Sequence, residues 1–522
     1  QAVLGRQNIL PTPWLTERHG YDPTFVWPHE ILACMAARVT ARPVKLVLTR
    51  QQQYGMVGYQ PYMSQKVELG AHRDGVLQGI GQHVVNITGM TDDYVEFGSA
   101  PAKSFYACEN ISATQRIQRG HVVLPTFMRS PWDGPGSWAL GSAMDELARS
   151  LDMDPLALRL ANYATTDPES GKPWSSKKLR EAYEEGARRF GWRERPKGGT
   201  LDGHWRIGFG VADCSQGQAR FHSTARVRLR ADATAQLESS FCDIGTGPAT
   251  VFPQIVAEVL GLDASKVGAL SGDTRLPYAG PTYGSSTTIS TGAAVQQAAF
   301  GVRAKLARLA GWPPDQIAMR DGHVWHAGES RRIEQVLSDA GVAELASDGT
   351  FDLPGDARVD MGSPGYPTRS FGVVFVEVGV DPDLGLLRLR RATGVYSAGR
   401  IINSMTARSQ MIGGIVWGWG MAAMEASHYD ASLGRWLSKD LAGVPIPVNA
   451  DIPPDIDIAF IDEYDMHSGP IGAKGIGELG ATGVAAAVAN AVYDAIGVRV
   501  RQLPITPDKL ISPFAGRQGS DR

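Results

Sequence analysis

The sequence has few cysteines, no excess of charge of either sign and no long hydrophobic run, and each absence excludes a class of protein. Its 51 Lys and Arg nearly balance 54 Asp and Glu, and a net charge of −3 gives no reason to expect nucleic acid or a membrane surface as partner. The longest uncharged runs, residues 411–424 and 479–493, are too short and too rich in glycine to cross a bilayer. We therefore expect neither nucleic-acid binding nor a membrane span.

The four cysteines lie far apart and form no C-x-x-C pair: Cys34, Cys108, Cys214 and Cys242. This spacing supports neither a zinc site nor an iron–sulfur cluster, and a disulfide framework is not expected in a chain of 522 residues. The 11 histidines are scattered, so no metal ligands are expected from protein side chains. Free thiols favour the cytoplasm, and export to the periplasm with a partner subunit is the alternative.

Several common catalytic motifs are missing: the phosphate loop G-x-x-x-x-G-K-[ST], the zinc-protease motif H-E-x-x-H and the nucleophile elbow G-x-S-x-G. The spacing of Gly475, Gly477 and Gly480 does fit the dinucleotide fingerprint G-x-G-x-x-G. However, that fingerprint must follow a buried strand, and residues 466–473 do not have the composition of one. An NAD-dependent dehydrogenase remains an alternative on this match alone.

Glycine is abundant, with 60 residues, and after residue 205 it recurs in loops that lead into apolar helices. Glycine allows close backbone approach to a ligand, and the first turn of a helix offers free N–H groups to an anion. A single such loop is usually an ordinary helix start. Four of them predict helix N-termini that converge on one large phosphorylated ligand; the loops are residues 243–250, 283–292, 399–406 and 472–480.

Two charged residues in glycine-containing loops are candidates for chemistry. Glu478 is the carboxylate in the last loop, before the apolar run 484–492, which suggests a general base beside a phosphate-bearing cofactor. The alternative is a carboxylate that only interacts with the helix dipole. Arg129, in the loop 127–136, could bind a phosphate or a substrate oxygen through its guanidinium, or it could pair with loop carbonyls.

The order of patterns predicts a mixed α/β (α+β) protein with two domains. We expect a helix at 30–39, strands at 43–49, 64–70 and 79–85, and two helices within 141–161 separated at Asp154–Pro155. Residues 167–201 turn polar and basic, which suggests a boundary there. The predicted domains are residues 1–185 and 186–522.

Three motifs together resemble the molybdenum-binding subunit of the xanthine oxidase family, and in particular bacterial aldehyde oxidoreductases. They are residues 473–480, 243–247 and 400–410. Residues 42–50, 128–131 and 498–509 also fit, so the resemblance runs from about residue 25 to residue 510. It implies the two-domain molybdenum-cofactor-binding architecture of the molybdenum hydroxylases.

The resemblance implies a molybdopterin cytosine dinucleotide cofactor with molybdenum, and it assigns Glu478 as the catalytic base. It also implies cofactor contacts at Ile244, Gly245, Thr246, Gly284, Ser285, Arg400, Ile401, Ile402, Asn403, Ser404, Met405, Thr406, Gln410, Lys474, Gly475, Ile476 and Gly477. The implied reaction is the hydroxylation of a small molecule, an aldehyde or an N-heterocycle, with oxygen from water. Because the chain has no cluster motif, 2Fe-2S centres and FAD are expected on an iron–sulfur subunit and a FAD subunit.

The sequence departs from the family at several positions. A glycine-rich loop of the family is replaced by residues 18–24, where Gly20 and Tyr21 are the closest counterparts. Gln1 matches a glutamine beside the metal, and the substrate-orienting arginine of the family falls at Gln216, with Arg220 nearby. The family's upstream segment is missing, so we expect a fragment, a processed product or a subunit completed by a separate chain. These departures motivate the alternative of a non-catalytic or assembly component.

Overall fold

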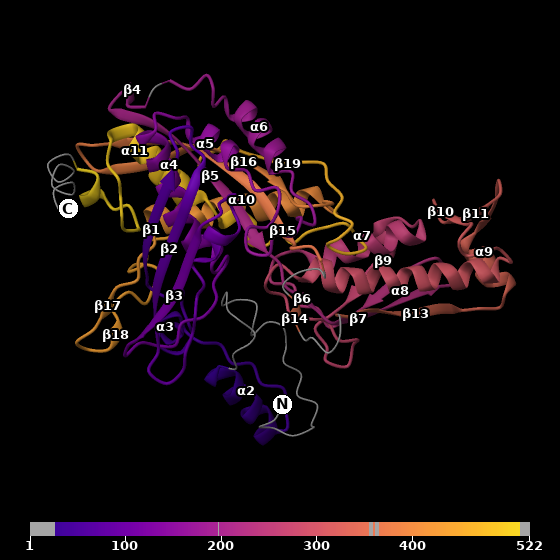
Figure 1. The fold of residues 1–522 in the computed structure, drawn as a ribbon. Helices are drawn as coiled ribbons and strands as arrows, with labels where there is room; N and C mark the ends of the chain where they lie inside the picture. Colours follow the sequence, from indigo (N-terminus) through magenta and orange to yellow (C-terminus); the bar gives the residue numbers. More distant parts are fainter. Residues whose placement is uncertain (1–26, 197, 354–358, 361–364, 512–522) are drawn as a thin grey trace.

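The computed structural model describes residues 27–196, 198–353, 359–360 and 365–511. Figure 1 shows a five-stranded sheet with helix α11 in one part of the molecule, while a four-stranded sheet with α7, α8 and α9 extends to one side. The positions predicted at Gln1, Gly20 and Tyr21 lie outside the described residues.

The first part of the chain is built on a three-stranded sheet. Strand β1 (Met63–Ala71) pairs antiparallel with β2 (Leu77–Thr88), which pairs parallel with β3 (Ile111–Arg119). Helix α4 (Asp133–Ser150) packs on this sheet, and α5 (Pro155–Ala161) follows after Asp154, whose carboxylate accepts from the N–H groups of Leu156 and Ala157. The two helices and their break are as predicted, although α4 begins earlier, at the end of the loop that contains Arg129.

The predicted strand at 43–49 is wrong. Helix α2 (Pro28–Thr40) and helix α3 (Arg50–Met56) flank this segment, which has no regular secondary structure and pairs with no strand among the described residues. Pro43 lacks an N–H group for a ladder, and Val44 and Val47 are 36% and 71% exposed. Apolar alternation alone cannot make a strand when no neighbouring strand accepts its hydrogen bonds.

The five-stranded sheet is buried on both faces. Its order is β19-β16-β15-β5-β4, from β4 (Thr200–Asp202), β5 (Trp205–Gly217), β15 (Arg369–Asp381), β16 (Leu386–Ser397) and β19 (Ile456–Phe460). Helix α11 (Val484–Ile496) packs on one face with α10 (Ser404–Ala423), and α6 (Leu179–Phe190) packs on the other. Alternate residues of β5 face each side, because strand side chains have a period of two.

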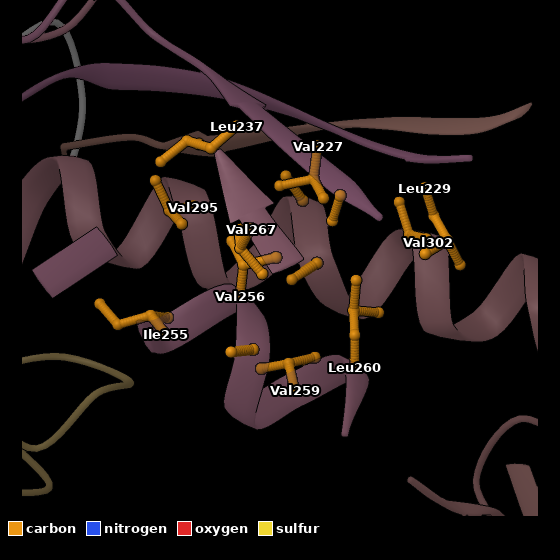
Figure 2. Close-up of a cluster of buried hydrophobic side chains, with 14 of the residues drawn as sticks. Val227, Leu229, Leu237, Ile255, Val256, Val259, Leu260, Val267, Val295 and Val302 are labelled. Atoms are coloured by element: carbon orange, nitrogen blue, oxygen red, sulfur yellow. The ribbon is translucent and has the colours of Figure 1, made fainter. Parts of the chain in front are cut away.

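A four-stranded sheet with its own core forms the side extension. Its strands are β7 (Ser223–Arg230), β8 (Ala235–Glu238), β9 (Val267–Leu270) and β13 (Glu344–Phe351), covered by α7 (Pro248–Leu260) and α8 (Thr287–Leu309). Figure 2 shows Val227, Leu229 and Leu237 of the sheet facing aliphatic side chains of both helices. The smaller elements are β6 (Arg220–Phe221) with β14 (Val359–Asp360), β10 (Ala318–Arg320), β11 (His323–His326), β12 (Glu329–Arg332), α9 (Ile333–Asp339), β17 (Tyr429–Asp430) and β18 (Arg435–Trp436), together with 3-10 turns at Ala100–Lys103, Ala264–Lys266, Asn449–Asp451, Leu479–Ala481 and Pro507–Lys509.

The helices predicted after the four glycine-containing loops are present as α7, α8, α10 and, after a short 3-10 turn, α11. The stretch Leu479–Ile496 has the length and apolarity of a membrane span, but 83% of it is buried inside the protein, where α11 is a core helix. The four cysteines are thiols that take part in no disulfide, and Cys214 is buried. The division at residue 185 stays a prediction; that position lies within α6.

Close approach of α11 to β5 depends on glycine. A Cβ atom on Gly210 would lie 1.9 Å from the carbonyl oxygen of Ala487, and one on Gly208 would lie 2.0 Å from that of Ala491. These are backbone atoms, so the helix itself would have to move away from the sheet. The distance between α11 and the sheet is therefore set by the two glycines.

We expect Gly210→Ala to lower the free energy of unfolding by about 1–3 kcal/mol or more, because overpacking would displace α11. Chemical denaturation of the two proteins would measure the change. Gly70→Ala is the matched control, since Gly70 also lies in a strand but nothing approaches within 4 Å of the added Cβ. Equal midpoints for wild type and Gly210→Ala would contradict this packing.

Candidate active site

The four predicted loops line one cavity of about 1600 Å3. Its volume exceeds the roughly 300–1,000 Å3 of ordinary small-molecule sites, so it can accept a large ligand. The wall includes residues from all four loops and helix starts: Ile244, Thr246, Tyr283, Gly284, Ser285, Ser286, Arg400, Ile401, Ile402, Asn403, Lys474, Gly475, Ile476, Gly477 and Glu478. The four loops therefore meet at one cavity, as predicted, while the phosphorylated ligand stays a prediction.

Helix N-termini contribute to the same wall. Val251 of α7, Thr287 of α8 and Thr406 of α10 line the cavity from the first turns of their helices. The residues before α7 and α8 make no side-chain cap, whereas Asn403 caps α10 by accepting from the N–H of Thr406. Uncapped first turns leave backbone N–H groups available to anionic oxygens.

Glu478 is partly exposed to the cavity, and its carboxylate accepts a hydrogen bond from the Ser285 hydroxyl at 2.7 Å. Burial raises the pKa of this carboxyl above its ordinary value, and the negative charge of Asp133 adds to the rise. The Ser285 hydroxyl, the backbone of Ser130 and the charge of Arg129 act in the opposite direction. The carboxyl therefore has a raised proton affinity in a site that partly excludes water, as suits a general base.

Arg129 holds two of the loops together. Its Nε donates to the carbonyl of Gly477 at 2.9 Å, and one Nη donates to the carbonyl of Gln410 at 2.8 Å. Gln410 in turn donates from its side chain to the carbonyl of Gly245 at 3.3 Å. Arg129 thus pairs with one loop carbonyl and one carbonyl of helix α10, and it fixes the backbone beside Glu478; a phosphate or substrate contact of Arg129 stays a prediction.

The side chain of Lys474 points into the protein, away from the cavity. Its ammonium is fully buried and donates to the Ser176 hydroxyl at 2.8 Å and to Glu463 at 3.3 Å. Glu463 also accepts from the N–H of Gly399 at 3.0 Å, which ties the loop of Arg400 to the loop of Glu478. Only the backbone of Lys474 is therefore available to a ligand.

Most of the predicted site residues lie in the cavity wall, including Arg129, Gln216, Thr406 and Gln410 in addition to the loop residues above. Gly245, Ser404 and Met405 are outside it, and Met405 is 81% exposed. Arg400 lines the cavity and also pairs with Glu258 at 2.6 Å. Their roles as cofactor contacts remain predictions.

Comparison with known proteins identifies the family. A family described as molybdopterin cofactor-binding domain matches residues 181–453, which is more than half of the 522 residues. A second family of the same description matches residues 19–163. The chain belongs to the molybdopterin cofactor-binding family. It is therefore a molybdenum-cofactor protein of the xanthine oxidase and aldehyde oxidoreductase type, as the three sequence motifs implied.

Curated relatives carry the same kind of name. The aldehyde oxidoreductase molybdenum-binding subunit PaoC of Escherichia coli strain K12 is 35% identical over 497 residues, which cover 93% of this chain and 65% of that protein. The xanthine dehydrogenase molybdenum-binding subunit of Escherichia coli O157:H7 is 29% identical over 509 residues, covering 92% and 66%. The chain thus spans about two thirds of the length of these relatives.

Solved structures of the family share the fold. The aldehyde oxidoreductase from Desulfovibrio desulfuricans superimposes with a TM-score of 0.78 at 25% identity, covering 92% of this chain and 52% of that one. The mixed helix and strand architecture with two cofactor-binding regions is thereby confirmed.

The residues present fit the molybdenum cofactor of the family. An added Cβ on Gly477, in the cavity wall, would meet only the Ser285 hydroxyl at 3.9 Å, so this glycine leaves room for a ligand. Backbone donors from helix starts suit the phosphates of such a cofactor. The described residues contain no group of three or more His, Cys, Asp and Glu that could hold a metal ion directly.

Sequence reasoning missed several residues of the wall. Asp133 lies beside the cavity and pairs with Arg369, and the aromatic rings of Phe97, Trp132 and Trp174 line it. Asp133 and Trp132 belong to the predicted loop 127–136, so that loop was a usable signal. Arg369 stands in no motif; only the pairing of β15 with β5 brings it to the site.

A buried carboxyl supports the loop beside Glu478. Glu96 is fully buried and accepts from the backbone N–H of Trp132, the hydroxyl of Tyr94 and the amide of Gln60. Burial raises the pKa of Glu96 from 4.5 to about 7. The folded protein then holds this proton more tightly than the unfolded chain, so stability falls as pH rises from about 4.5 to about 7.

We expect Glu96→Gln to remove this loss, because the amide does not titrate. Between pH 5 and pH 8 the variant should gain roughly 2–3 kcal/mol in free energy of unfolding relative to wild type. Urea denaturation at both pH values would measure it, with the exposed Glu109→Gln as control. A constant difference between Glu96→Gln and wild type across this pH range would contradict the buried protonated carboxyl.

Proposed function

We propose that this chain is the cofactor-bearing part of a molybdenum hydroxylase that oxidises an aldehyde or an N-heterocycle with oxygen from water. The observation that carries the proposal is the Glu478 carboxyl, with its raised pKa, in the wall of a cavity formed by four glycine-containing loops and helix starts. The names of the relatives, an aldehyde oxidoreductase and a xanthine dehydrogenase, support the reaction class. The substrate is a small molecule.

The residues of this chain bind, orient and move a proton. Glu478 takes the proton from the attacking oxygen, since a carboxylate whose pKa is raised holds a proton more strongly than an ordinary one. The Ser285 hydroxyl and the Arg129-bound loop fix the direction of the carboxylate. The molybdenum cofactor, when bound, activates that oxygen and accepts the two electrons of the oxidation. Partial burial of Glu478 limits access of bulk water to the proton transfer.

We further propose the cytosine dinucleotide form of the cofactor, which the volume of the cavity supports. Ile244, Gly245, Thr246, Gly284, Ser285, Arg400 and the segments 401–406 and 474–477, with Gln410, would hold it. Electrons would leave to 2Fe-2S and FAD groups on partner subunits, as the designation of the relatives as molybdenum-binding subunits suggests. We also propose that the protein lies in the cytoplasm and that the chain divides into two domains near residue 185.

Glu478→Gln should retain molybdenum but lose turnover by at least about 100-fold, because the amide cannot accept the proton. Single-turnover reduction of the enzyme by an aldehyde such as benzaldehyde, beside elemental analysis, would measure both quantities. Glu329→Gln, at an exposed position, is the control. Near-normal rates in a loaded Glu478→Gln enzyme would overturn the mechanism; loaded wild type without any turnover would favour a non-catalytic component.

Gly477→Val should prevent cofactor loading, because the side chain would project into space that is open beside the Ser285 hydroxyl. Molybdenum content and CMP released by acid would each fall from near-stoichiometric to a small fraction. Gly70→Val, at an exposed strand glycine, should load normally. Molybdenum without CMP in wild type would reject the dinucleotide form, and a fully loaded Gly477→Val protein would reject the placement.

A further inference from the structure

Arg369 is the residue of β15 that meets the cavity. It is the first residue of the strand and lies opposite Gly217 at the end of β5, so its neighbour Ser370 lies opposite Gln216. Its side chain is 17% exposed and lines the cavity that contains Glu478. The strand register therefore places a guanidinium at the end of the sheet, on the face of Ser215 and Gly217, while Gln216 projects from the other face.

Two of the three guanidinium nitrogens are held by the protein. Nε donates to the Ser215 hydroxyl at 2.8 Å, and Nη2 donates to the Asp133 carboxylate at 2.5 Å. Nη1 has no hydrogen-bond partner within the described ranges of the chain. The guanidinium group is thus fixed in orientation, and the N–H groups of Nη1 can donate to a ligand. This is the geometry of a preorganised donor.

Gly217 leaves room for that free edge. A Cβ atom on Gly217 would lie 3.2 Å from Nη1 of Arg369, a tight contact that would shift Nη1 slightly. The neighbouring Gln216 does not compete as a donor, because its amide nitrogen donates to the carbonyl of Gly217 at 3.0 Å and its oxygen accepts from Ser130 at 3.3 Å. At the ends of β5 and β15 the donor with a free N–H edge is therefore Arg369 and not Gln216.

Arg129 holds backbone and no carboxylate. Its Nε and one Nη donate to the carbonyls of Gly477 and Gln410, and its Nη1 lies beside α10, 3.5 Å from where a Cβ of Gly413 would stand. Arg129 therefore supports the loops, while Arg369 faces the space between them.

The charge around Arg369 indicates what it binds. Asp133 already pairs with the guanidinium and also accepts from the backbone N–H of Gly217. Because the pair is close to neutral and Glu478 lies nearby, an incoming carboxylate gains little net attraction and meets two acidic groups. An uncharged carbonyl oxygen needs only the hydrogen bond.

We propose that Arg369 orients the substrate by donating a hydrogen bond from Nη1 to a carbonyl oxygen, in the role that a glutamine at position 216 cannot fill. Gly217 is the residue that keeps this edge open. The inference rests on the proposed function for the identity of the substrate, but the carbonyl-binding site itself can be tested without turnover.

The test is the binding of benzamide, an unreactive carbonyl compound, to the cofactor-loaded enzyme by isothermal titration calorimetry. Arg369→Met removes the donor, and we expect an increase in the dissociation constant of about tenfold or more. Gly217→Ala keeps Arg369 and Asp133 but shifts Nη1, and should weaken binding in the same direction even if Arg369→Met folds poorly. Arg206→Gln, at an exposed position on the same strand β5, is the control and should bind as wild type does.

Benzoate and benzaldehyde separate the remaining outcomes. Benzoate should bind no more tightly than benzamide. A strong preference for benzoate that is lost in Arg369→Met would show that Arg369 binds a carboxylate and would overturn the proposal as stated. With benzaldehyde, Arg369→Met should raise KM more than it lowers kcat. Unchanged benzamide binding in Arg369→Met and Gly217→Ala, or no saturable binding in wild type, would leave Arg369 a structural partner of Asp133. Arg369-dependent binding in a molybdenum-loaded enzyme that oxidises no aldehyde or heterocycle would instead reject the proposed function.

Discussion

The loop of Glu478 can reach the cavity only because Gly475 lies directly against the backbone of Ser285. A Cβ atom at Gly475 would stand 2.0 Å from the carbonyl oxygen of Ser285, a distance that no side chain tolerates. The same loop is held from the other side, where the Ser370 hydroxyl donates to the carbonyl of Gly475 at 2.7 Å. The hydrogen bond between Ser285 and Glu478, and hence the direction of the carboxylate, follows from this contact.

Buried charged side chains behind the cavity wall hold two of its loops in place. Lys474 and its acidic partners Glu463 and Asp465 have fully or almost fully buried side chains. A buried ion pair contributes little net stability, but removing one partner leaves an uncompensated charge and is costly. Glu463 also accepts from the Ser397 hydroxyl and the N–H of Gly399. We infer that this network holds the loops of Arg400 and Glu478 in one relative position, while the ammonium group of Lys474 stays outside the cavity.

The sequence predicted the parts of this protein that depend on local pattern. The glycine-containing loops, the helices after them and the carboxylate at Glu478 could be recognised because a helix start and its preceding turn lie close together in the chain. The strand prediction at 43–49 failed for the opposite reason, since its valines and leucines are typical of a strand but no partner strand lies beside it in the part of the chain that the structure describes. Strand formation is decided by distant residues, which one sequence does not reveal.

Arg369 could not be predicted from the sequence for the same physical reason. It meets Ser215, 154 residues earlier in the chain, through the register of two antiparallel strands, and a shift of one residue would turn its side chain to the opposite face of the sheet. The resemblance to the family places a substrate-orienting arginine at the position of Gln216. The fold can bring a guanidinium to the same cavity from a residue that is distant in the sequence. A neighbouring strand can supply the donor when the residue on the first strand is neutral.

The acidity of Glu478 and the orientation of the substrate are linked through one ion pair. Asp133 raises the pKa of Glu478 through its negative charge, and Arg369 keeps Asp133 charged, because the guanidinium opposes the rise in the pKa of Asp133 that burial causes. A general base works best when its pKa is near the working pH, and burial and the charge of Asp133 both move the pKa of Glu478 upward from its ordinary value. The guanidinium that offers its free edge to the cavity is therefore also the charge that keeps Asp133 ionised beside Glu478. Binding and proton transfer in this site thus depend on the same pair of residues, on two elements that the fold brings together.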